Sequence, residues 1–367
     1  MAILLDMHAH YLRMALEQAW LGRGTCAPNP AVGAVLVQGN TLIAQSHHAR
    51  AGLPHAEILA LQSAIGYTQG STLYVTLEPC NHWGKTPPCV NAIQESGVAR
   101  VVYAYADPNP LVVQNNSPEI LRSAGIEVIH YPLPEIDLFY QSFTHWIRHK
   151  KPWLSIKIAQ SLDAKIAGAH GARVSISNAL CAQRTHQHRL RSDVIMTTAH
   201  TVLHDNPALN VRLEGEVAQA KPLILLDRTL SVGSEALIWK TAELVHRYYD
   251  SALYPEPLPA AGSDHPCSKT ENHIEPFFNL PALIQEVGLL GYHDVWVEAG
   301  PTLFKALHSH DLVQETYIYV APKILGPSAM ALDLPDTFFE KEHHLFTEIL
   351  GDNIIHKIRW EHACSQE

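Results

Sequence analysis

The chain has 367 residues, more than one hydrophobic core usually organises, so two domains of about 100–200 residues each are expected. Its 36 acidic side chains outnumber its 26 basic ones and give a formal charge of −10. A protein that binds nucleic acid gains affinity by neutralising phosphates, so this balance argues against a nucleic-acid partner. Histidine is abundant, with 24 residues, but this number alone identifies no site.

The cysteines are too few and too unevenly spaced for a disulfide scaffold. They are Cys26, Cys80, Cys89, Cys181, Cys267 and Cys364. The N-terminus places Asp6 where a signal peptide would have a basic flank and a longer apolar run. No apolar stretch approaches the roughly 18 residues that span a bilayer. We therefore expect a soluble, cytoplasmic protein with reduced thiols and no membrane partner.

Helices and strands alternate through the first part of the chain. Apolar spacing predicts helices over residues 11–20, 55–64, 88–96, 121–125 and 136–147, and strands over residues 31–37, 41–45, 72–77, 98–105 and 126–129. Gly39 and Asn40 form a predicted hairpin turn between the first two strands. Elements of this length in this order predict an α/β layered domain with a largely buried sheet.

A basic segment, Arg148 to Lys151 followed by Pro152, marks the expected domain boundary. Beyond it, strands are predicted over residues 153–158, 193–198, 223–227, 294–298 and 315–320, with a polar helix over 182–191. Residues 248–276 lack periodicity and are expected to form a long loop or a partly disordered insert. The sequence thus predicts one α/β domain over residues 1–148 and a second over 149–367.

The sharpest chemical signal combines His55 at a predicted helix start, Cys80 after a strand and Cys89 before the next helix. One imidazole and two thiolates are three of the four ligands of a tetrahedral zinc ion, and the fourth position is left for water, as in catalytic sites. Glu57 has the type and placement of a general acid and base beside such a site. The alternatives are a structural zinc site, with His82 as the one obvious fourth ligand, or unrelated buried cysteines.

The H-x-E, P-C and C pattern is the signature of zinc deaminases that act on nucleobases, although eight residues rather than two separate the cysteines here. The segment 79–89 (PCNHWGKTPPC), with 28–30 (PNP) and 107–110 (DPNP), resembles the bifunctional deaminase/reductase family of riboflavin biosynthesis. The resemblance covers nearly the whole chain. It implies an N-terminal cytidine-deaminase-like α/β/α layered domain and a C-terminal dihydrofolate-reductase-like α/β domain.

The resemblance also implies the reactions. The first domain would use zinc to remove the 2-amino group of a 2,5-diamino-6-(phosphoribosylamino)pyrimidinone. The second would use NADPH to reduce the ribosyl chain to ribityl. The partner is then a small phosphoribosylaminopyrimidine, with no nucleic acid and no membrane, and the sequence leaves a homo-oligomer open.

Residues of the first domain are assigned to the substrate pocket by resemblance. They are Asn29, His48, Lys85, Asp107 and Asn109. Each has a plain alternative, because Asn29 and the 107–110 segment are good turn sequences and His48 and Lys85 could be solvated. The charge of Lys85 beside the metal site favours a role in binding an anionic phosphate. The family usually has Gly-x-Gly where this chain has residues 114–116 (QNN), so a different local loop is expected there.

Residues of the second domain are assigned in the same way. Ala159, Thr201, Asp205 and Gly300 would contact NADPH, and Arg189, Leu209, Arg212 and Glu298 would hold the substrate, with the arginines on its phosphate. Gly300 follows a strand and precedes a helix, where backbone N–H groups can meet a phosphate. The absence of a Gly-x-Gly-x-x-Gly sequence argues against a Rossmann site.

Three positions of the second domain depart from the family pattern. Ala164 stands where the family has glycine, and Arg173 and Ser175 stand where it has a substrate-binding serine and a cofactor-binding tryptophan. These departures leave open an active deaminase with a non-catalytic C-terminal domain. A second rival, a nucleobase deaminase acting on RNA, is opposed by the acidic charge and by the absence of a basic, aromatic-interleaved surface.

Overall fold

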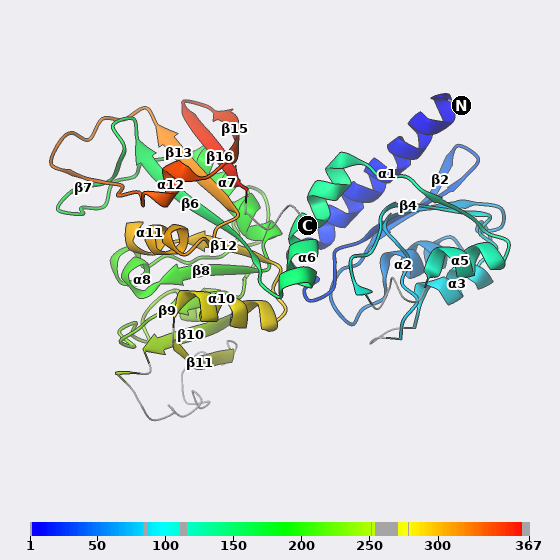
Figure 1. Cartoon of the computed structure of the whole chain (residues 1–367), viewed down its shortest axis with the longest axis horizontal. Helices are drawn as coiled ribbons and strands as arrows, with labels where there is room; N and C mark the ends of the chain where they lie inside the picture. Colours follow the sequence, from blue (N-terminus) through cyan, green and yellow to red (C-terminus); the bar gives the residue numbers. More distant parts are fainter. Residues whose placement is uncertain are drawn as a thin grey trace. The chain divides into compact units, whose positions relative to one another are not determined.

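The computed structural model describes residues 2–83, 87–110, 116–250, 252–253, 271–277 and 279–361. The chain divides into two compact units, Met1–Lys150 and Lys151–Glu367, and each contains a β-sheet covered by helices (Figure 1). In the described part, no helix is both long enough and apolar enough to cross a membrane.

The first unit is built on a five-stranded sheet in the order β2-β1-β3-β4-β5. Its strands are β1 (Gly33–Gln38), β2 (Thr41–His47), β3 (Thr72–Leu77), β4 (Arg100–Tyr105) and β5 (Glu127–His130). Its helices are α1 (Ala2–Gly22), α2 (Ala56–Ser63), α3 (Cys89–Glu95), α5 (Ser117–Ser123) and α6 (Pro134–His149). β1 is antiparallel to both neighbours, whereas β3, β4 and β5 run parallel. Figure 1 shows α1 and α6 on one face of the sheet and α2, α3 and α5 on the other.

Two glycines explain how the first strands are placed. Gly39 has a φ of +61° in the turn that joins β1 to β2, a conformation that glycine adopts without steric cost. A Cβ atom on Gly33 would lie 1.9 Å from the carbonyl oxygen of Ala15, so only glycine lets α1 approach the sheet this closely. The predicted hairpin and the predicted helix–sheet layering are both confirmed here.

The second unit is built on a nine-stranded sheet in the order β11-β10-β9-β8-β12-β6-β13-β16-β15, with a separate β14-β7 pair. The strands are β6 (Trp153–Ser161), β7 (Lys165–Ala169), β8 (Val194–Thr198), β9 (Leu223–Leu226), β10 (Leu244–Asp250), β11 (Glu271–Phe277), β12 (Asp294–Glu298), β13 (Glu315–Ala321), β14 (Ala329–Ala331), β15 (His343–Leu350) and β16 (Asn353–Trp360). From β11 through β13 neighbouring strands run parallel, and β16 and β15 close the sheet in antiparallel pairs.

Helices cover both faces of this sheet. They are α7 (Ala179–Arg191), α8 (Ala199–Asp205), α9 (Ile238–Thr241), α10 (Leu280–Leu289), α11 (Pro301–Ser309) and α12 (Thr337–Glu340). One core cluster joins the sheet to α10 and α11, and another joins it to α7, α8 and α9. Strand β9 and the middle of β12 are continuous apolar runs, as expected where both faces of a sheet are buried. The unit is therefore a three-layered α/β domain.

Two boundaries differ from the sequence expectation. Helix α6 continues through His149, because the basic residues of its last turn interact favourably with the negative end of the helix dipole. It ends at Lys150, the C-cap residue, which has a φ of +52°. The expected boundary at 148 therefore falls inside a helix. In the segment expected to be a loop, β10 continues to Asp250 and Glu271–Phe277 form the parallel edge strand β11. That part of the loop prediction is wrong, and most of the segment lies outside the described residues.

Candidate functional site

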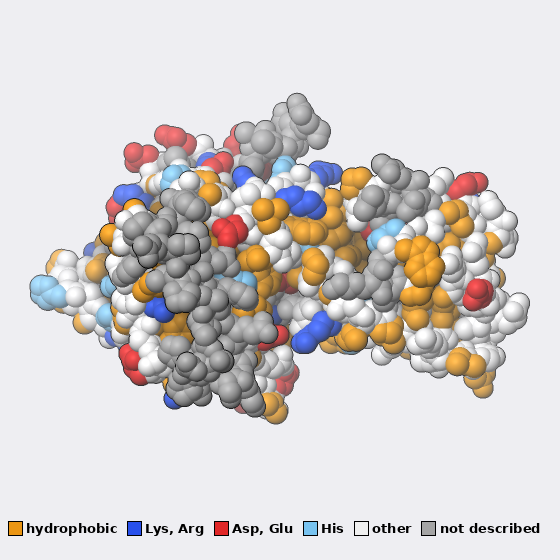
Figure 2. All heavy atoms as spheres, turned by 90° about the horizontal axis from the view of Figure 1, so that it is seen from below, with side chains coloured by type: hydrophobic (Ala, Val, Ile, Leu, Met, Phe, Trp, Pro, Cys, Tyr) orange, Lys and Arg blue, Asp and Glu red, His pale blue; other side chains and the backbone are white. Residues whose placement is uncertain are grey.

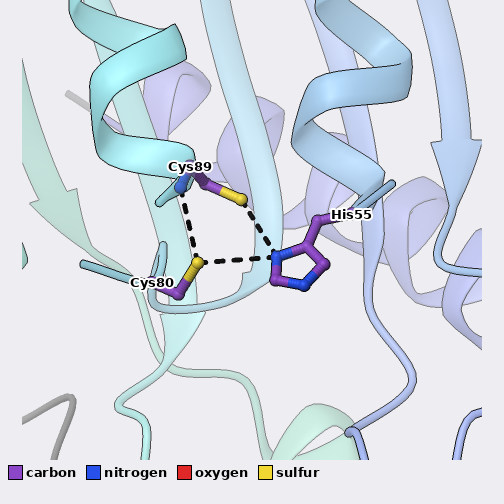
Figure 3. A group of neighbouring side chains, drawn as sticks. All are labelled: His55, Cys80 and Cys89. Atoms are coloured by element: carbon purple, nitrogen blue, oxygen red, sulfur yellow. Dashed lines mark hydrogen bonds between the residues drawn. The ribbon is translucent and has the colours of Figure 1, made fainter. Parts of the chain in front are cut away.

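His55, Cys80 and Cys89 come together at one end of the first sheet (Figure 3). His55 is the N-cap residue of α2, Cys80 follows β3, and Cys89 begins α3. The Nδ1 atom of His55 lies 3.1 Å from Cys89 Sγ and 3.5 Å from Cys80 Sγ. The three candidate ligand atoms lie within 4.8 Å of one another. Two helix starts and a strand end thus position all three side chains.

The donor set fits a zinc ion. With Zn–S bonds of about 2.3 Å and Zn–N bonds of about 2.0 Å at tetrahedral angles, nitrogen and sulfur should lie about 3.5 Å apart. The separations around His55 Nδ1 are close to this value. The Cys89 side chain and the Cys89 backbone N–H both form hydrogen bonds with the Cys80 sulfur. These hydrogen bonds lower the pKa of the Cys80 thiol well below its ordinary value and so favour the thiolate, the form that zinc binds. Among the described residues, His82 is not a member of this group.

Glu57 lies in the first turn of α2, two residues after His55, and is not part of the metal-binding group. Its side chain is buried, with 4% of its surface exposed. Burial first, and the neighbouring Cys80 second, raise the pKa of Glu57 above its ordinary value. A raised pKa makes the buried carboxylate a stronger proton acceptor, as a general base requires.

A cavity of about 420 Å³ opens onto these residues within the first unit. This volume lies in the usual range for small-molecule sites. The predicted residues Asn29, His48, Asp107 and Asn109 all line it. Lys85 lies outside the described residues, so its predicted role is untested.

Hydrogen bonds orient two of these side chains. His48 Nδ1 donates to the carbonyl oxygen of Pro54 at 3.1 Å, which leaves Nε2 to accept from Asn29 Nδ2 at 3.2 Å. Burial lowers the pKa of His48, so the neutral ring that this pattern requires is favoured. Asp107 Oδ1 accepts from the N–H of Asn109 at 2.8 Å, and burial raises the pKa of Asp107 to about 7. The turn role and the pocket role of Asp107 are therefore compatible.

The cavity also contains residues that sequence reasoning missed. Glu78 lies at the end of β3, and Phe143, Trp146 and Lys150 come from α6. The aromatic spacing of α6 was visible in the sequence, but it indicated a helix and did not indicate which surface the helix lines. Phe143, Trp146 and Lys150 thus give the cavity a side that is formed by α6.

In the second unit the structure brings Arg189 and Glu298 into direct contact. Arg189 Nε donates to Glu298 Oε1 at 2.6 Å and Nη2 donates to Oε2 at 2.8 Å. Arg189 Nη1 donates to the carbonyl oxygen of Asn210 at 2.8 Å, and Trp296 Nε1 donates to Glu298 Oε1 at 2.9 Å. The pair is nearly buried, with 9% and 15% of the two side chains exposed. These two predicted substrate residues thus form a bidentate ion pair at the end of β12.

Replacing Arg189 by Met should destabilise the second unit by about 3–5 kcal/mol, because Glu298 would remain buried without its partner. Urea denaturation followed by circular dichroism measures the change. Arg184→Met on the same helix is the matched control, since Arg184 pairs with Glu348 where 30% and 43% of the side chains are exposed. An exposed pair contributes about 0–1 kcal/mol. Equal effects of the two substitutions would contradict this assignment.

The same pair predicts an acid sensitivity. Burial alone would raise the pKa of Glu298, but the Arg189 guanidinium outweighs it and lowers the pKa from 4.5 to about 2. A lowered pKa in the folded state contributes stability that is present above pH 4.5 and is lost as the pH falls toward 2. The urea midpoint of the second unit should therefore fall across this range. In Glu298→Gln this part of the pH dependence should disappear, and an unchanged profile would argue against the pair.

The predicted cofactor residues of the second unit lie on different elements. Thr201 and Asp205 lie on α8, where the N–H of Thr201 is capped by Thr198 Oγ1 at 3.3 Å. Gly300 is the N-cap of α11, and a Cβ atom there would meet nothing within 4 Å. Ala159 lies on β6, beside Tyr319 of β13. Open space beside Gly300 fits an approaching phosphate of a nicotinamide cofactor.

Arg212 and Leu209, both predicted to bind substrate, differ in exposure. Arg212 is exposed and its Nη1 donates to Asn210 Oδ1 at 2.6 Å, so Arg189 and Arg212 contact the same asparagine. Leu209 is buried in the core with 2% exposure and a φ of +45°. Its side chain therefore packs inside the unit, and its predicted contact with substrate is untested.

Two of the departures from the family pattern have local explanations. Ala164 adopts a φ of +56°, where glycine is the ordinary choice, within a turn closed by its N–H to the carbonyl oxygen of Ser161 at 3.0 Å. The turn is thus retained with alanine in it. Arg173 Nε lies 3.3 Å from Asp205 Oδ1, so this arginine reaches a predicted cofactor residue. Nothing in the structure explains Ser175.

Each of the two units matches a known protein family. The cytidine and deoxycytidylate deaminase zinc-binding region matches residues 5–105, and the RibD C-terminal domain matches residues 152–341. The riboflavin biosynthesis protein RibD of Escherichia coli K12 is 33% identical over 371 residues, which cover 93% of this chain and 97% of that protein.

Solved structures extend the similarity to the whole fold. Acinetobacter baumannii RibD, form 1, has a TM-score of 0.82 at 32% identity and covers 98% of this chain and 100% of that one. A Thermotoga maritima protein described as a diaminohydroxyphosphoribosylaminopyrimidine deaminase/5-amino-6-(5-phosphoribosylamino)uracil reductase has a TM-score of 0.83 at 30% identity, with 97% and 99% coverage.

The fold and the metal-binding group therefore define a two-domain protein in which a zinc deaminase domain precedes a reductase domain. The chain belongs to the RibD family of riboflavin biosynthesis proteins. The resemblance and the fold class expected from the sequence are confirmed, and zinc and NADPH are the cofactors that the two domains imply.

Proposed function

We propose that the first unit removes the 2-amino group of 2,5-diamino-6-(5-phosphoribosylamino)pyrimidin-4(3H)-one and that the second reduces the product with NADPH to 5-amino-6-(5-phosphoribitylamino)uracil. The Thermotoga relative carries both activities in its description, and this chain covers 99% of it. The observation that carries the proposal is the His55, Cys80 and Cys89 group beside buried Glu57 in a nucleotide-sized cavity.

In the deaminase, His55 Nδ1 and the two cysteine sulfurs would hold zinc, which supplies an activated water at neutral pH when bound. Glu57 accepts a proton from the attacking water and delivers it to the departing amine. Water is consumed and ammonia leaves, so the carbon exchanges its amino group for an oxygen. Because Glu57 is buried, its carboxyl group is shielded from bulk water during this proton transfer.

The pocket side chains would orient the pyrimidine. With Nδ2 of Asn29 engaged by His48, the Oδ1 atom of Asn29 can accept from an N–H group of the ring. Asp107 and Asn109 lie on one turn and supply further polar groups from the end of β4. Fixed donors and acceptors place the reacting carbon, which is how positioning contributes to rate.

In the reductase, NADPH would supply the hydride, and the chain would supply position and charge. Thr201, Asp205, Gly300 and Ala159 are proposed for the cofactor, and Glu298, Arg212 and Leu209 for the substrate. Arg189 is engaged with Glu298 and Asn210, which supports Arg212 as the phosphate-binding arginine. Arg189 would then hold Glu298 in place beside the substrate.

A non-catalytic second unit is the rival proposal, and it is disfavoured because the RibD C-terminal domain matches this unit. Supplying NADPH and the deaminated intermediate to the purified protein tests it directly. Loss of the nicotinamide absorbance is expected. A constant absorbance would favour the rival.

We also propose that the protein acts in the cytoplasm on a small molecule and does not bind nucleic acid. The net charge of −10 supports this. On the face in Figure 2, Lys and Arg side chains lie scattered among hydrophobic and neutral ones. Binding of a tRNA pool at low salt would contradict the proposal.

A further inference from the structure

The geometry points to Lys150, held by Trp146, as a residue that binds the phosphate of the deaminase substrate at the α6 side of the cavity. The inference rests on the proposed deaminase function and adds a substrate-binding residue to it. Both residues belong to the first unit and line its cavity. Neither belongs to the metal-binding group.

The charges of the cavity lining point to Lys150. Among the described residues of the lining, Glu57, Glu78 and Asp107 are acidic and Lys150 is the single Lys or Arg. The three carboxyl groups come from α2 and from the ends of β3 and β4, near the metal-binding group, whereas Lys150 comes from α6. When the pyrimidine of the substrate lies at the metal, these carboxyl groups repel its anionic phosphate, which is therefore most favourably placed at the α6 side.

The backbone of Lys150 is a second observation. This residue caps α6 with a φ of +52°, and its N–H donates to the carbonyl oxygen of Trp146 at 2.8 Å. Glycine is the usual residue at such a cap, because a side chain is strained in the left-handed region. A lysine here places a cation at the cavity at a conformational cost, and strained backbone of this kind concentrates at functional sites.

Trp146 fixes where the ammonium group lies. Lys150 Nζ lies 4.1 Å from the centroid of the Trp146 ring, within the range of a cation–π contact. Trp146 is in turn stacked near Phe143, with ring centroids 6.3 Å apart, and both rings line the cavity. Lys150 is therefore the binding residue and Trp146 a positioning residue, and the aromatic wall keeps the cation beside the cavity.

The decisive variant is Lys150→Gly, because glycine suits the left-handed cap and removes only the side chain. The measurement is steady-state deamination by the zinc-loaded full chain, with the phosphorylated substrate and with its dephosphorylated form. We expect KM for the phosphorylated substrate to rise about tenfold, as for the loss of a charge-assisted contact. We expect kcat and the KM for the dephosphorylated form to stay within about twofold, because only ground-state binding of the phosphate is lost.

Lys150→Arg should restore a low KM for the phosphorylated substrate, and Trp146→Leu should raise it without changing kcat. Arg148→Ala is the matched control, since it removes a cation from the same turn of α6 outside the cavity lining. A KM ratio between the two substrates that is the same in Lys150→Gly and wild type would overturn the inference and leave the deaminase proposal intact. A wild-type protein that deaminates neither substrate would overturn both.

Discussion

Replacing Glu57 by Gln should lower kcat for deamination by about 10²–10⁴, the usual contribution of a positioned general acid and base. Glutamine has nearly the same shape and can form hydrogen bonds, but it cannot take a proton from water or give one to the departing amine. Because Glu57 is not a member of the metal-binding group, zinc should stay bound at one ion per chain. Activity and zinc content, measured on the same preparation, check both parts.

Glu95→Gln serves as the control, because Glu95 is an exposed carboxylate on α3 and outside the cavity lining. It should keep full activity and full zinc content. If Glu57→Gln deaminates at the normal rate, the proton transfer assigned to Glu57 is wrong. If it loses zinc as well as activity, Glu57 has a structural role that this mechanism does not include.

Replacing Cys89 by Ser should remove zinc and deamination together while leaving the reduction of the deaminated intermediate intact. A serine hydroxyl is a far weaker zinc ligand than a thiolate, and two protein ligands do not hold a catalytic zinc. The Cys89 side chain is fully buried. Metal analysis and the two separate assays measure the result.

Cys181→Ser is the matched control, since Cys181 is also fully buried, at the start of α7 in the second unit. It should retain zinc and deamination. Normal zinc content in Cys89→Ser would show that a different set of residues holds the metal.

The fold could be predicted largely from periodicity. Strand β3 and strand β12 have the expected bounds, because each is a short apolar run with polar or turn residues on both sides. Edge strand β11 was missed, since an edge strand does not need the continuous apolar run of a central one. The end of α6 was missed because its basic last turn has the same composition as a solvated linker.

The metal-binding residues could be predicted from the sequence because their chemistry restricts residue type and spacing. The contact between Arg189 and Glu298 could not be predicted, since 109 residues separate the two. Only the β8-β12-β6 strand order brings α7 over the end of β12. The cavity wall from α6 was hidden for the same reason. Residue type predicts which side chains can do chemistry, whereas the topology decides which of them meet.

Both reactions are assigned to one chain. The most direct measurement supplies the zinc-loaded full-length protein with the diaminopyrimidine substrate and NADPH, and follows ammonia release and nicotinamide absorbance together. We expect one ammonia to be released and one NADPH to be oxidised for each substrate consumed, with the ribityl product formed. Ammonia release without NADPH oxidation, even when the deaminated intermediate is added directly, would contradict it.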